Sequence, residues 1–320
     1  MPGCAKLPGM RIGVFIGGVS GERTSVAELV ASARDAEARG FTAGWVPHIP
    51  WSLDGLTALA LAGPATERID LGTAVMPTYP RHPLAMAHQA LSTQAATGGR
   101  LLLGVGPSHP VVIEGMYGLT YDAPARHTRE YVEVLRAAFA CTGNVEFHGD
   151  FFDFSSMLDV PGGSPAPILV AALAPLMLRL AGELTDGTIT YWANERALAD
   201  HVVPRITRAA EAAGRSAPRV VVGLPVAVTT DADQARERAA KLFSVYNAIP
   251  TYQRIMGRGG AAEPADVAAI GTESAVQARL RAYADAGATD LCAAPLGLDD
   301  DREASHRRTL DLLASLAPDF

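Results

Sequence analysis

Two histidines, His48 and His109, are the residues best placed to handle a proton in this sequence. Each follows a short apolar run that is typical of a buried strand, 43–46 for the first and 101–105 for the second. An unperturbed imidazole titrates at about pH 6.5, so it can donate or accept a proton under neutral conditions. We therefore predict a catalytic role for one of these two rings, with a purely structural histidine as the alternative for either.

Other catalytic patterns are missing from the chain. It contains neither HExxH nor GxSxG, and Gly104 and Gly106 are not followed by the third glycine of a dinucleotide fingerprint. No lysine lies at a predicted strand end, which argues against a Schiff base, and no pair of carboxylates suggests a glycosidase. This scarcity favours an enzyme in which a bound redox cofactor does the difficult chemistry. A protein that binds a ligand without turnover is the alternative.

Small residues and prolines gather where three strands are predicted to end. The glycine-rich segment 17–21 follows the first strand and leaves room for a flat ring, or serves simply as a flexible turn. Residues 172–174 precede Pro175, which suits the first position of a helix, and free N–H groups at a helix start can bind a phosphate. The segment 190–193 ends the next strand on the same side. Together, these last two segments predict a phosphate cradle.

Eight short apolar runs alternate with helical patterns along the chain. The predicted strands are 10–16, 43–46, 69–75, 101–105, 168–172, 188–191, 220–228 and 290–294. The predicted helices are 26–40, 54–62, 84–97, 125–140, 175–184, 195–213, 233–245, 274–286 and 303–316. Continuous apolar strands are buried on both faces, as in a parallel sheet covered by helices. Eight such units predict a (β/α)8 TIM barrel, in which the loops after the strands converge on one active site.

Three segments exceed ordinary connections and are predicted as insertions. They are 107–124 after strand four, 142–167 after helix four and 249–271 after strand seven. The second contains a hairpin pattern at 145–154, and the third is predicted to be irregular. Long loops in compact domains are often lids, so we expect the first and third segments to cover the strand ends.

The composition is typical of a globular protein with a large core. Apolar residues make up 48% and charged residues 19%, and 27 basic against 34 acidic residues give a net charge of −7. The acidic balance argues against nucleic-acid binding, and no apolar stretch reaches the roughly 18 residues of a membrane span. The sequence shows neither a secretory signal nor cysteines with zinc-ligand spacing, so we expect a cytoplasmic protein without a metal. We expect 10–320 to form one catalytic domain after a loosely ordered extension at 1–9.

Several motifs together resemble the luciferase-like monooxygenase superfamily, in the actinobacterial branch that uses the deazaflavin coenzyme F420. The motifs are RIDLGTAV at 68–75, RHP at 81–83, GGRLLLGVG at 98–106, YDAPARH at 121–127, LAPLMLRLAG at 173–182 and DGT at 186–188. The resemblance implies an oxidoreductase that transfers a hydride between F420 and a small organic substrate, with an FMN-dependent monooxygenase as the alternative. It also implies a homodimer through the helices 54–62 and 84–97, unless their apolar residues face the barrel instead.

The resemblance further implies where the cofactor binds. The ring is expected against Thr73, Ala74, Val75, Gly106, Pro107 and Ser108, with His48 beside it. The phosphate is expected at Ala172, Leu173 and Ala174, and the tail of the cofactor at Tyr191 and Trp192. A non-proline cis peptide is expected at Thr73–Ala74. Some F420-dependent members carry acidic residues where this chain has His48 and His109, which puts in doubt a transfer of the sugar-phosphate dehydrogenase mechanism.

Overall fold

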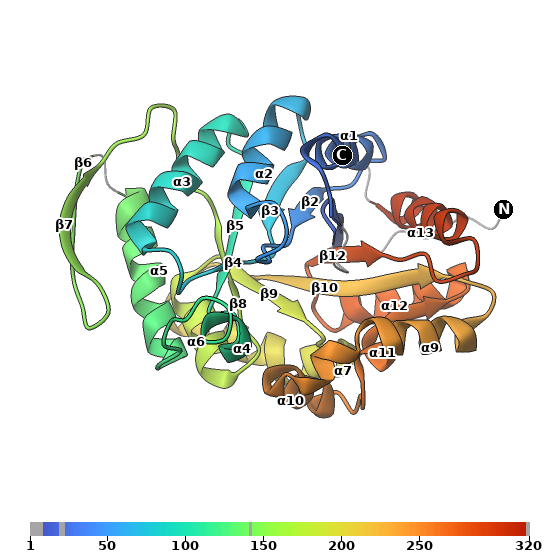
Figure 1. The fold of residues 1–320 in the computed structure, drawn as a ribbon. Helices are drawn as coiled ribbons and strands as arrows, with labels where there is room; N and C mark the ends of the chain where they lie inside the picture. Colours follow the sequence, from blue (N-terminus) through green and yellow to red (C-terminus); the bar gives the residue numbers. More distant parts are fainter. Residues whose placement is uncertain (1–8, 19–22, 141–142, 318–320) are drawn as a thin grey trace.

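Eight parallel strands form a closed barrel in the computed structural model, which describes residues 9–18, 23–140 and 143–317 (Figure 1). The strands are β1 (Arg11–Phe15), β2 (Ala43–Val46), β3 (Asp70–Thr73), β5 (Leu101–Gly106), β8 (Ile168–Ala171), β9 (Gly187–Tyr191), β10 (Arg219–Val228) and β12 (Asp290–Pro295). Strand β12 pairs with both β10 and β1, which closes the ring. The predicted TIM barrel is confirmed. The extension expected at 1–9 lies outside the described residues, apart from Gly9.

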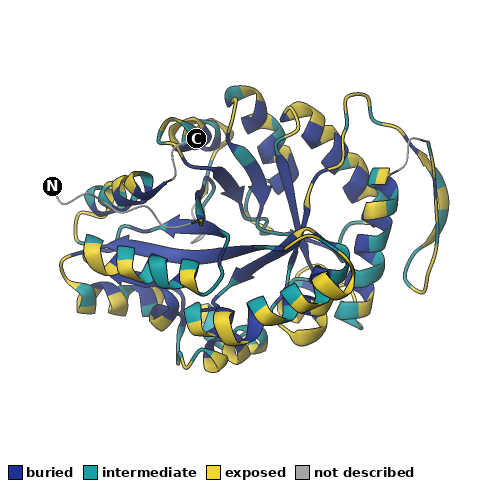
Figure 2. Ribbon diagram, turned by 180° about the vertical axis from the view of Figure 1, so that it is seen from behind, coloured by how far each residue is buried: buried dark blue, intermediate teal, exposed yellow. Residues whose placement is uncertain are grey.

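Helices surround the barrel and turn their buried faces toward the strands (Figure 2). They are α1 (Val26–Ala38), α2 (Gly55–Ala62), α3 (Pro83–Ala96), α5 (Pro124–Ala140), α6 (Pro175–Leu184), α7 (Glu195–Ala197), α8 (Val203–Ala212), α9 (Ala232–Leu242), α12 (Glu273–Asp285) and α13 (Arg302–Leu316). The helix expected at 195–213 is continuous through α7, a π-helical turn, η2 (Leu198–Val202), and α8, and only this turn departs from a regular α-helix. Pro204 lies in the first turn of α8 and has no N–H to continue a regular ladder.

The three long segments differ in how much regular structure they contain. The second insertion forms the hairpin of β6 (Gly143–His148) and β7 (Asp153–Leu158), which confirms the hairpin pattern. The third was expected to be irregular, and this is wrong. After α9 come η3 (Ser244–Ala248), α10 (Pro250–Arg258), α11 (Pro264–Val267) and β11 (Ala269–Gly271). A proline at the first position starts each of these two helices, and β11 pairs with the end of β10. The first insertion contains only the short helix α4 (Pro110–Ile113).

The barrel interior is filled by side chains and is not a channel. Trp45 on β2 is fully buried there and packs with aliphatic residues of neighbouring strands and with Cys292 on β12. Two glycines make room for the indole, since a Cβ at Gly72 would overlap its ring and one at Gly13 would lie 2.8 Å from its Nε1. This packed interior supports the C-terminal ends of the strands.

An ion-pair cluster lies at the opposite end of the barrel, where the strands begin. Asp290, the first residue of β12, has a side chain that is only 4% exposed. It pairs with Arg11 of β1 at 2.6 Å and with Arg219 of β10 at 2.8 Å. These contacts tie three adjacent strands together, and they belong to the stability of the barrel rather than to its chemistry.

The outer faces of α2 and α3 carry few large apolar side chains. Leu56, Leu59, Met86 and Leu91 are buried toward the barrel, and Leu61 is the large apolar residue of these two helices that is exposed. This burial favours the alternative that the apolar residues of these helices form the core, and the homodimer stays a prediction. No helix within the described ranges has the length and apolar character needed to cross a bilayer.

Candidate functional site at the barrel mouth

The strand ends form a floor of partly accessible residues above the packed interior. Six side chains that end or follow barrel strands share this half-buried state: Phe15, Ala74, Val75, Ala171, Tyr191 and Pro295. Four of them, Phe15, Ala74, Val75 and Ala171, pack directly on the interior cluster around Trp45. The floor is therefore apolar, supported by the packed interior and partly accessible to solvent.

The end of β3 contributes its backbone and two small side chains. The non-proline cis peptide lies at Ala74–Val75, so the expectation of Thr73–Ala74 is wrong by one residue. The N–H of Ala74 still donates to the carbonyl of Val46 at 2.8 Å, so the ladder with β2 continues through Thr73 and the chain departs from it only afterwards. The hydroxyl of Thr73 donates to the carbonyl of Gly104 and accepts from its N–H. The Thr73 side chain is thus occupied, and only its backbone remains for a cofactor.

The glycines at the end of β5 bring strands together and do not leave empty space. A Cβ at Gly104 would overlap the carbonyl oxygen of Thr73, and one at Gly106 would lie 2.8 Å from the Cβ of Ala171. Beyond them, Ser108 adopts φ = 61°, and its carbonyl accepts a hydrogen bond of 3.2 Å from the hydroxyl of Tyr121. Pro107 and Ser108 are half-buried beside the floor.

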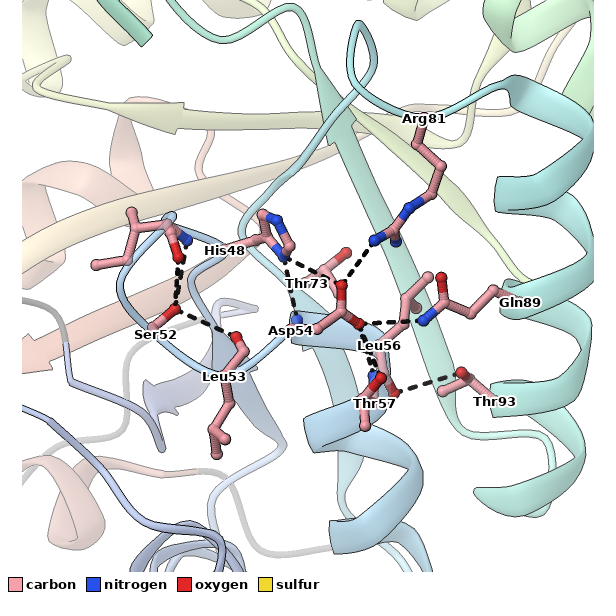
Figure 3. Close-up of polar contacts among 12 residues, drawn as sticks. His48, Ser52, Leu53, Asp54, Leu56, Thr57, Thr73, Arg81, Gln89 and Thr93 are labelled. Atoms are coloured by element: carbon pink, nitrogen blue, oxygen red, sulfur yellow. Dashed lines mark hydrogen bonds and ion pairs between the residues drawn. The ribbon is translucent and has the colours of Figure 1, made fainter. Parts of the chain in front are cut away.

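His48 is held at the end of β2 by a polar network (Figure 3). The N–H of Gly55 donates to its Nδ1 at 3.2 Å, and an Oδ2 of Asp54 lies 3.6 Å from the same nitrogen. Because Nδ1 accepts, the neutral ring carries its proton on Nε2. That Nε2 has no partner among the described residues and is not fully buried, so it can donate to a ligand.

Asp54 is the centre of this network. Its carboxylate accepts from Arg81 at 2.7 Å, from Gln89 at 3.1 Å and from the N–H of Thr57 at 3.0 Å. Burial alone would raise the pKa of Asp54, but the bonds from Arg81 and Thr57 lower it to about 2. Burial lowers the pKa of His48, with Asp54 opposing and Arg81 reinforcing the shift. At neutral pH, Asp54 is therefore ionised and His48 is a neutral Nε2–H donor.

His109 lies on the loop after β5 and faces an insertion. Its ring meets the ring of Tyr252 on α10 edge to face, with the centroids 4.9 Å apart. Burial lowers the pKa of His109, so this imidazole is also neutral at pH 7. The structure thus places both predicted histidines just after the ends of strands two and four of the barrel, β2 and β5.

The start of α6 has the features of an anion site. Ala174 is its exposed N-cap residue and provides no side-chain hydrogen bond, and Pro175 follows it. The Nε2 of His201 donates to the carbonyl of Leu173 at 2.7 Å, which leaves its buried Nδ1 without a partner. Burial lowers the pKa of His201, and the charges of Arg205 and Arg258 lower it further against the opposing bond to Leu173. Arg205 also donates to the carbonyl of His201 at 3.1 Å, so the histidine that contacts this helix start lies beside a cation.

Sequence analysis missed His201 and Arg205, because nothing in the pattern of 195–213 marks them. The fold brings His201, on the π-helical turn, to Leu173 at the start of α6. Of the two residues expected at the cofactor tail, Tyr191 is half-buried at the mouth. Trp192 is fully buried at φ = 61°, so its side chain supports the site from behind.

A cavity of about 730 Å³ lies at the ends of β1 and β12. Phe15 and Pro295 of the floor line it, as do Arg23, Arg238 and Arg302. Within the described ranges, no group of three or more His, Cys, Asp or Glu side chains is arranged to hold a metal ion.

Comparison with known proteins places this architecture in a family. The sequence model described as "Luciferase-like monooxygenase" matches residues 10–290. The chain is 33% identical over 237 residues to an F420-dependent glucose-6-phosphate dehydrogenase of Nocardia farcinica, covering 68% of this chain and 70% of that protein. It is 28% identical over 247 residues to a 5,10-methylenetetrahydromethanopterin reductase of Methanolobus tindarius, covering 77% and 74%.

Solved structures show the same fold at lower identity. An F420-dependent secondary alcohol dehydrogenase, in complex with an F420-acetone adduct, superposes with a TM-score of 0.79 at 18% identity, over 97% of this chain and 99% of that one. At this identity, the likeness concerns the fold alone. The family model matches most of the sequence and therefore shows family membership as well as fold. The chain belongs to the luciferase-like monooxygenase family.

Proposed function

We propose that this protein is an F420-dependent oxidoreductase that transfers a hydride between the coenzyme and a small organic substrate at the barrel mouth. The observation that carries the proposal is the start of α6, which combines a helix N-terminus without a side-chain cap with His201, bonded to Leu173 and flanked by Arg205. Helix starts and arginines both favour phosphate groups. Relatives named as F420-dependent, a glucose-6-phosphate dehydrogenase and a putative oxidoreductase, support the choice of cofactor.

The residues at the mouth fit such a group. Ala172, Leu173 and Ala174 would hold the phosphate, and Tyr191 lies where the tail would leave. Ala74, Val75 and the backbone of Thr73 would support one face of the ring, with Gly106, Pro107 and Ser108 along its edge. When bound, the deazaflavin supplies the carbon that accepts or donates the hydride. Apolar side chains around it exclude water from this transfer.

The proton that accompanies the hydride is assigned to a histidine. His48 presents an Nε2–H toward open space, held by Gly55 and Asp54. In this state it donates a hydrogen bond to a substrate oxygen, which stabilises negative charge as it develops there. His109 stands across the mouth and is the alternative.

A fluorescence titration of purified protein with F420 tests the cofactor. We expect saturable binding at one site per chain, and no change of F420 fluorescence would contradict the proposal. Oxygen consumption with reduced FMN would favour the FMN-dependent monooxygenase instead. Tight F420 binding without redox activity over a broad panel of alcohols and carbonyl compounds would favour a binding protein without turnover.

A further inference from the structure

Three tyrosines from different elements meet at one side of the barrel mouth. Tyr191 ends β9, Tyr246 lies on η3 and Tyr252 on α10. Their ring centroids form a triangle with sides of 5.8, 6.2 and 5.7 Å, and each pair of rings is inclined by 68° to 76°. We call these three residues the tyrosine wall. Tyr191 is far from the other two in the sequence, so the wall exists only in the folded protein.

The tyrosine wall adjoins the proposed cofactor site on two sides. Tyr191 belongs to the floor itself, and a Cβ at Gly223 on the next strand would lie 2.8 Å from its ring. Tyr252 meets the ring of His109, which follows directly after the residues expected along the cofactor edge. Trp192 packs behind the wall, 4.4 Å from Tyr191 and 5.1 Å from Tyr246. A substrate above the floor would therefore touch these rings.

The hydroxyl groups of the wall are available to a ligand. None of the three has a hydrogen-bond partner among the described residues, and none is a fully buried atom. A phenol both donates and accepts one or more hydrogen bonds. Edge-to-face rings offer apolar surface between these hydroxyls, and such surface suits a flat apolar body.

The wall carries no charge near neutral pH. Burial raises the pKa of Tyr191, Tyr246 and Tyr252, and it lowers the pKa of His109. Among the described residues, no ion pair or side-chain hydrogen bond joins these three tyrosines or His109 to Asp, Glu, Lys or Arg, and their side chains contact one another and Trp192 instead. An anion buried against these rings would find no charged group among them to compensate its lost hydration. The cavity at the ends of β1 and β12 is different, because Arg23, Arg238 and Arg302 line it.

We propose that the tyrosine wall selects an uncharged substrate with a flat apolar body and a carbonyl or hydroxyl oxygen, and that it discriminates against anions such as sugar phosphates and carboxylates. The inference rests on the proposed function for the placement of the substrate beside the cofactor. The choice of substrate class rests on the wall alone.

A matched pair of probes tests this selection. 2-Acetylnaphthalene and 2-naphthoate have nearly the same size and shape, and only the second carries a charge. We expect equilibrium dialysis to show at least tenfold tighter binding of the ketone to the wild-type protein, with and without F420. Equal or tighter binding of the carboxylate, or no binding of either probe, would overturn the proposal. Tighter carboxylate binding would point to the arginine-lined cavity as the substrate site.

Substitutions in the wall provide the second arm. The double variant Y246F/Y252F keeps both rings and removes two hydroxyls, so we expect it to fold and to bind 2-acetylnaphthalene about fivefold more weakly, the effect of one lost hydrogen bond. Tyr117→Phe, at an exposed tyrosine between α4 and α5, is the matched control and is expected to bind like wild type. Unchanged affinity of the double variant would refute a role for the hydroxyls.

The cofactor titration separates the two proposals. If F420 fails to bind the wild-type protein, the proposed function falls, whereas the probe affinities of the cofactor-free protein still decide the selectivity of the wall. If F420 binds and the probes do not discriminate, only the inference about the wall falls.

Discussion

Placing an acidic cap at the start of α6 separates stability from cofactor binding. Ala174 occupies the N-cap position, is exposed and offers no side-chain hydrogen bond to the first turn. In the Ala174→Asp variant, the carboxylate would accept from the N–H groups that we assign to the phosphate. The same change therefore stabilises the helix and blocks the anion site. Few substitutions at a binding site have this opposite pair of effects.

The expected gain in stability follows from helix capping, and the expected loss of F420 affinity follows from lost hydrogen bonds. An aspartate in place of alanine at an N-cap adds about 1 kcal/mol, which corresponds to a rise in Tm of about 2 °C for a chain of this size. Loss of two charge-assisted hydrogen bonds to a phosphate costs about 3 kcal/mol or more, even without the added charge repulsion. The affinity for F420 should therefore fall about a hundredfold or more.

Differential scanning calorimetry and F420 fluorescence titration measure the two effects on the same sample. Ile249→Asp is a matched control, since Ile249 caps α10 without a side-chain bond and is also followed by proline. It should raise Tm by a similar amount and leave F420 affinity unchanged. An Ala174→Asp variant with higher Tm and undiminished affinity would show that the phosphate does not bind at α6.

Three further predictions concern the scaffold. The pKa of Asp54 is lowered to about 2 in the folded protein, against 3.8 for an ordinary aspartate. Its ionisation therefore contributes about 2 kcal/mol to the free energy of unfolding above pH ~4, and this contribution is lost as the pH falls toward 2. Urea unfolding of wild type and Asp54→Asn between pH 7 and 3 should show a difference in unfolding free energy that shrinks with acidification. Asp290→Ala leaves two arginines without their buried partner and should lower the free energy of unfolding by about 3 kcal/mol, and a loss under 1 kcal/mol would mean that the cluster is dispensable. Gly104→Ala should abolish the folded barrel, because the added Cβ would overlap the Thr73 carbonyl. In the control Gly257→Ala, on α10, the added Cβ meets nothing within 4 Å, so this variant should be as stable as wild type or slightly more stable. Thermal unfolding followed by circular dichroism measures both variants.

Much of the architecture could be predicted from local patterns. Continuous apolar runs such as 220–228 identify strands buried on both faces, and this burial is a property of the residues themselves. Proline at the first helical position and glycine after the last mark several helix limits in the same way. The prediction failed where a local signal was weak or interrupted. Pro204 produced a π-helical turn within an expected single helix, and the insertion at 249–271 gained its two helices through Pro250 and Pro264.

The candidate site, like the fold, could be predicted from the sequence only in part. His48, His109 and the start of α6 could be named from the sequence because each directly follows a predicted strand, and parallel strands carry their C-terminal ends to one face. The position of the cis peptide was missed by one residue, because only the hydrogen bond from Ala74 to Val46 shows how far the ladder of β3 continues.

The sequence alone thus determined the barrel and the face on which its chemistry lies, since both depend on the order and polarity of neighbouring residues. Only the tertiary structure brought His201 to Leu173 at the start of α6, Arg81 to Asp54 beside His48, and Tyr246 and Tyr252 to Tyr191. These contacts join residues from separate elements, and their distances depend on how helices and insertions pack on the barrel. No periodicity in the chain records that packing, because it arises from the shapes of many side chains together.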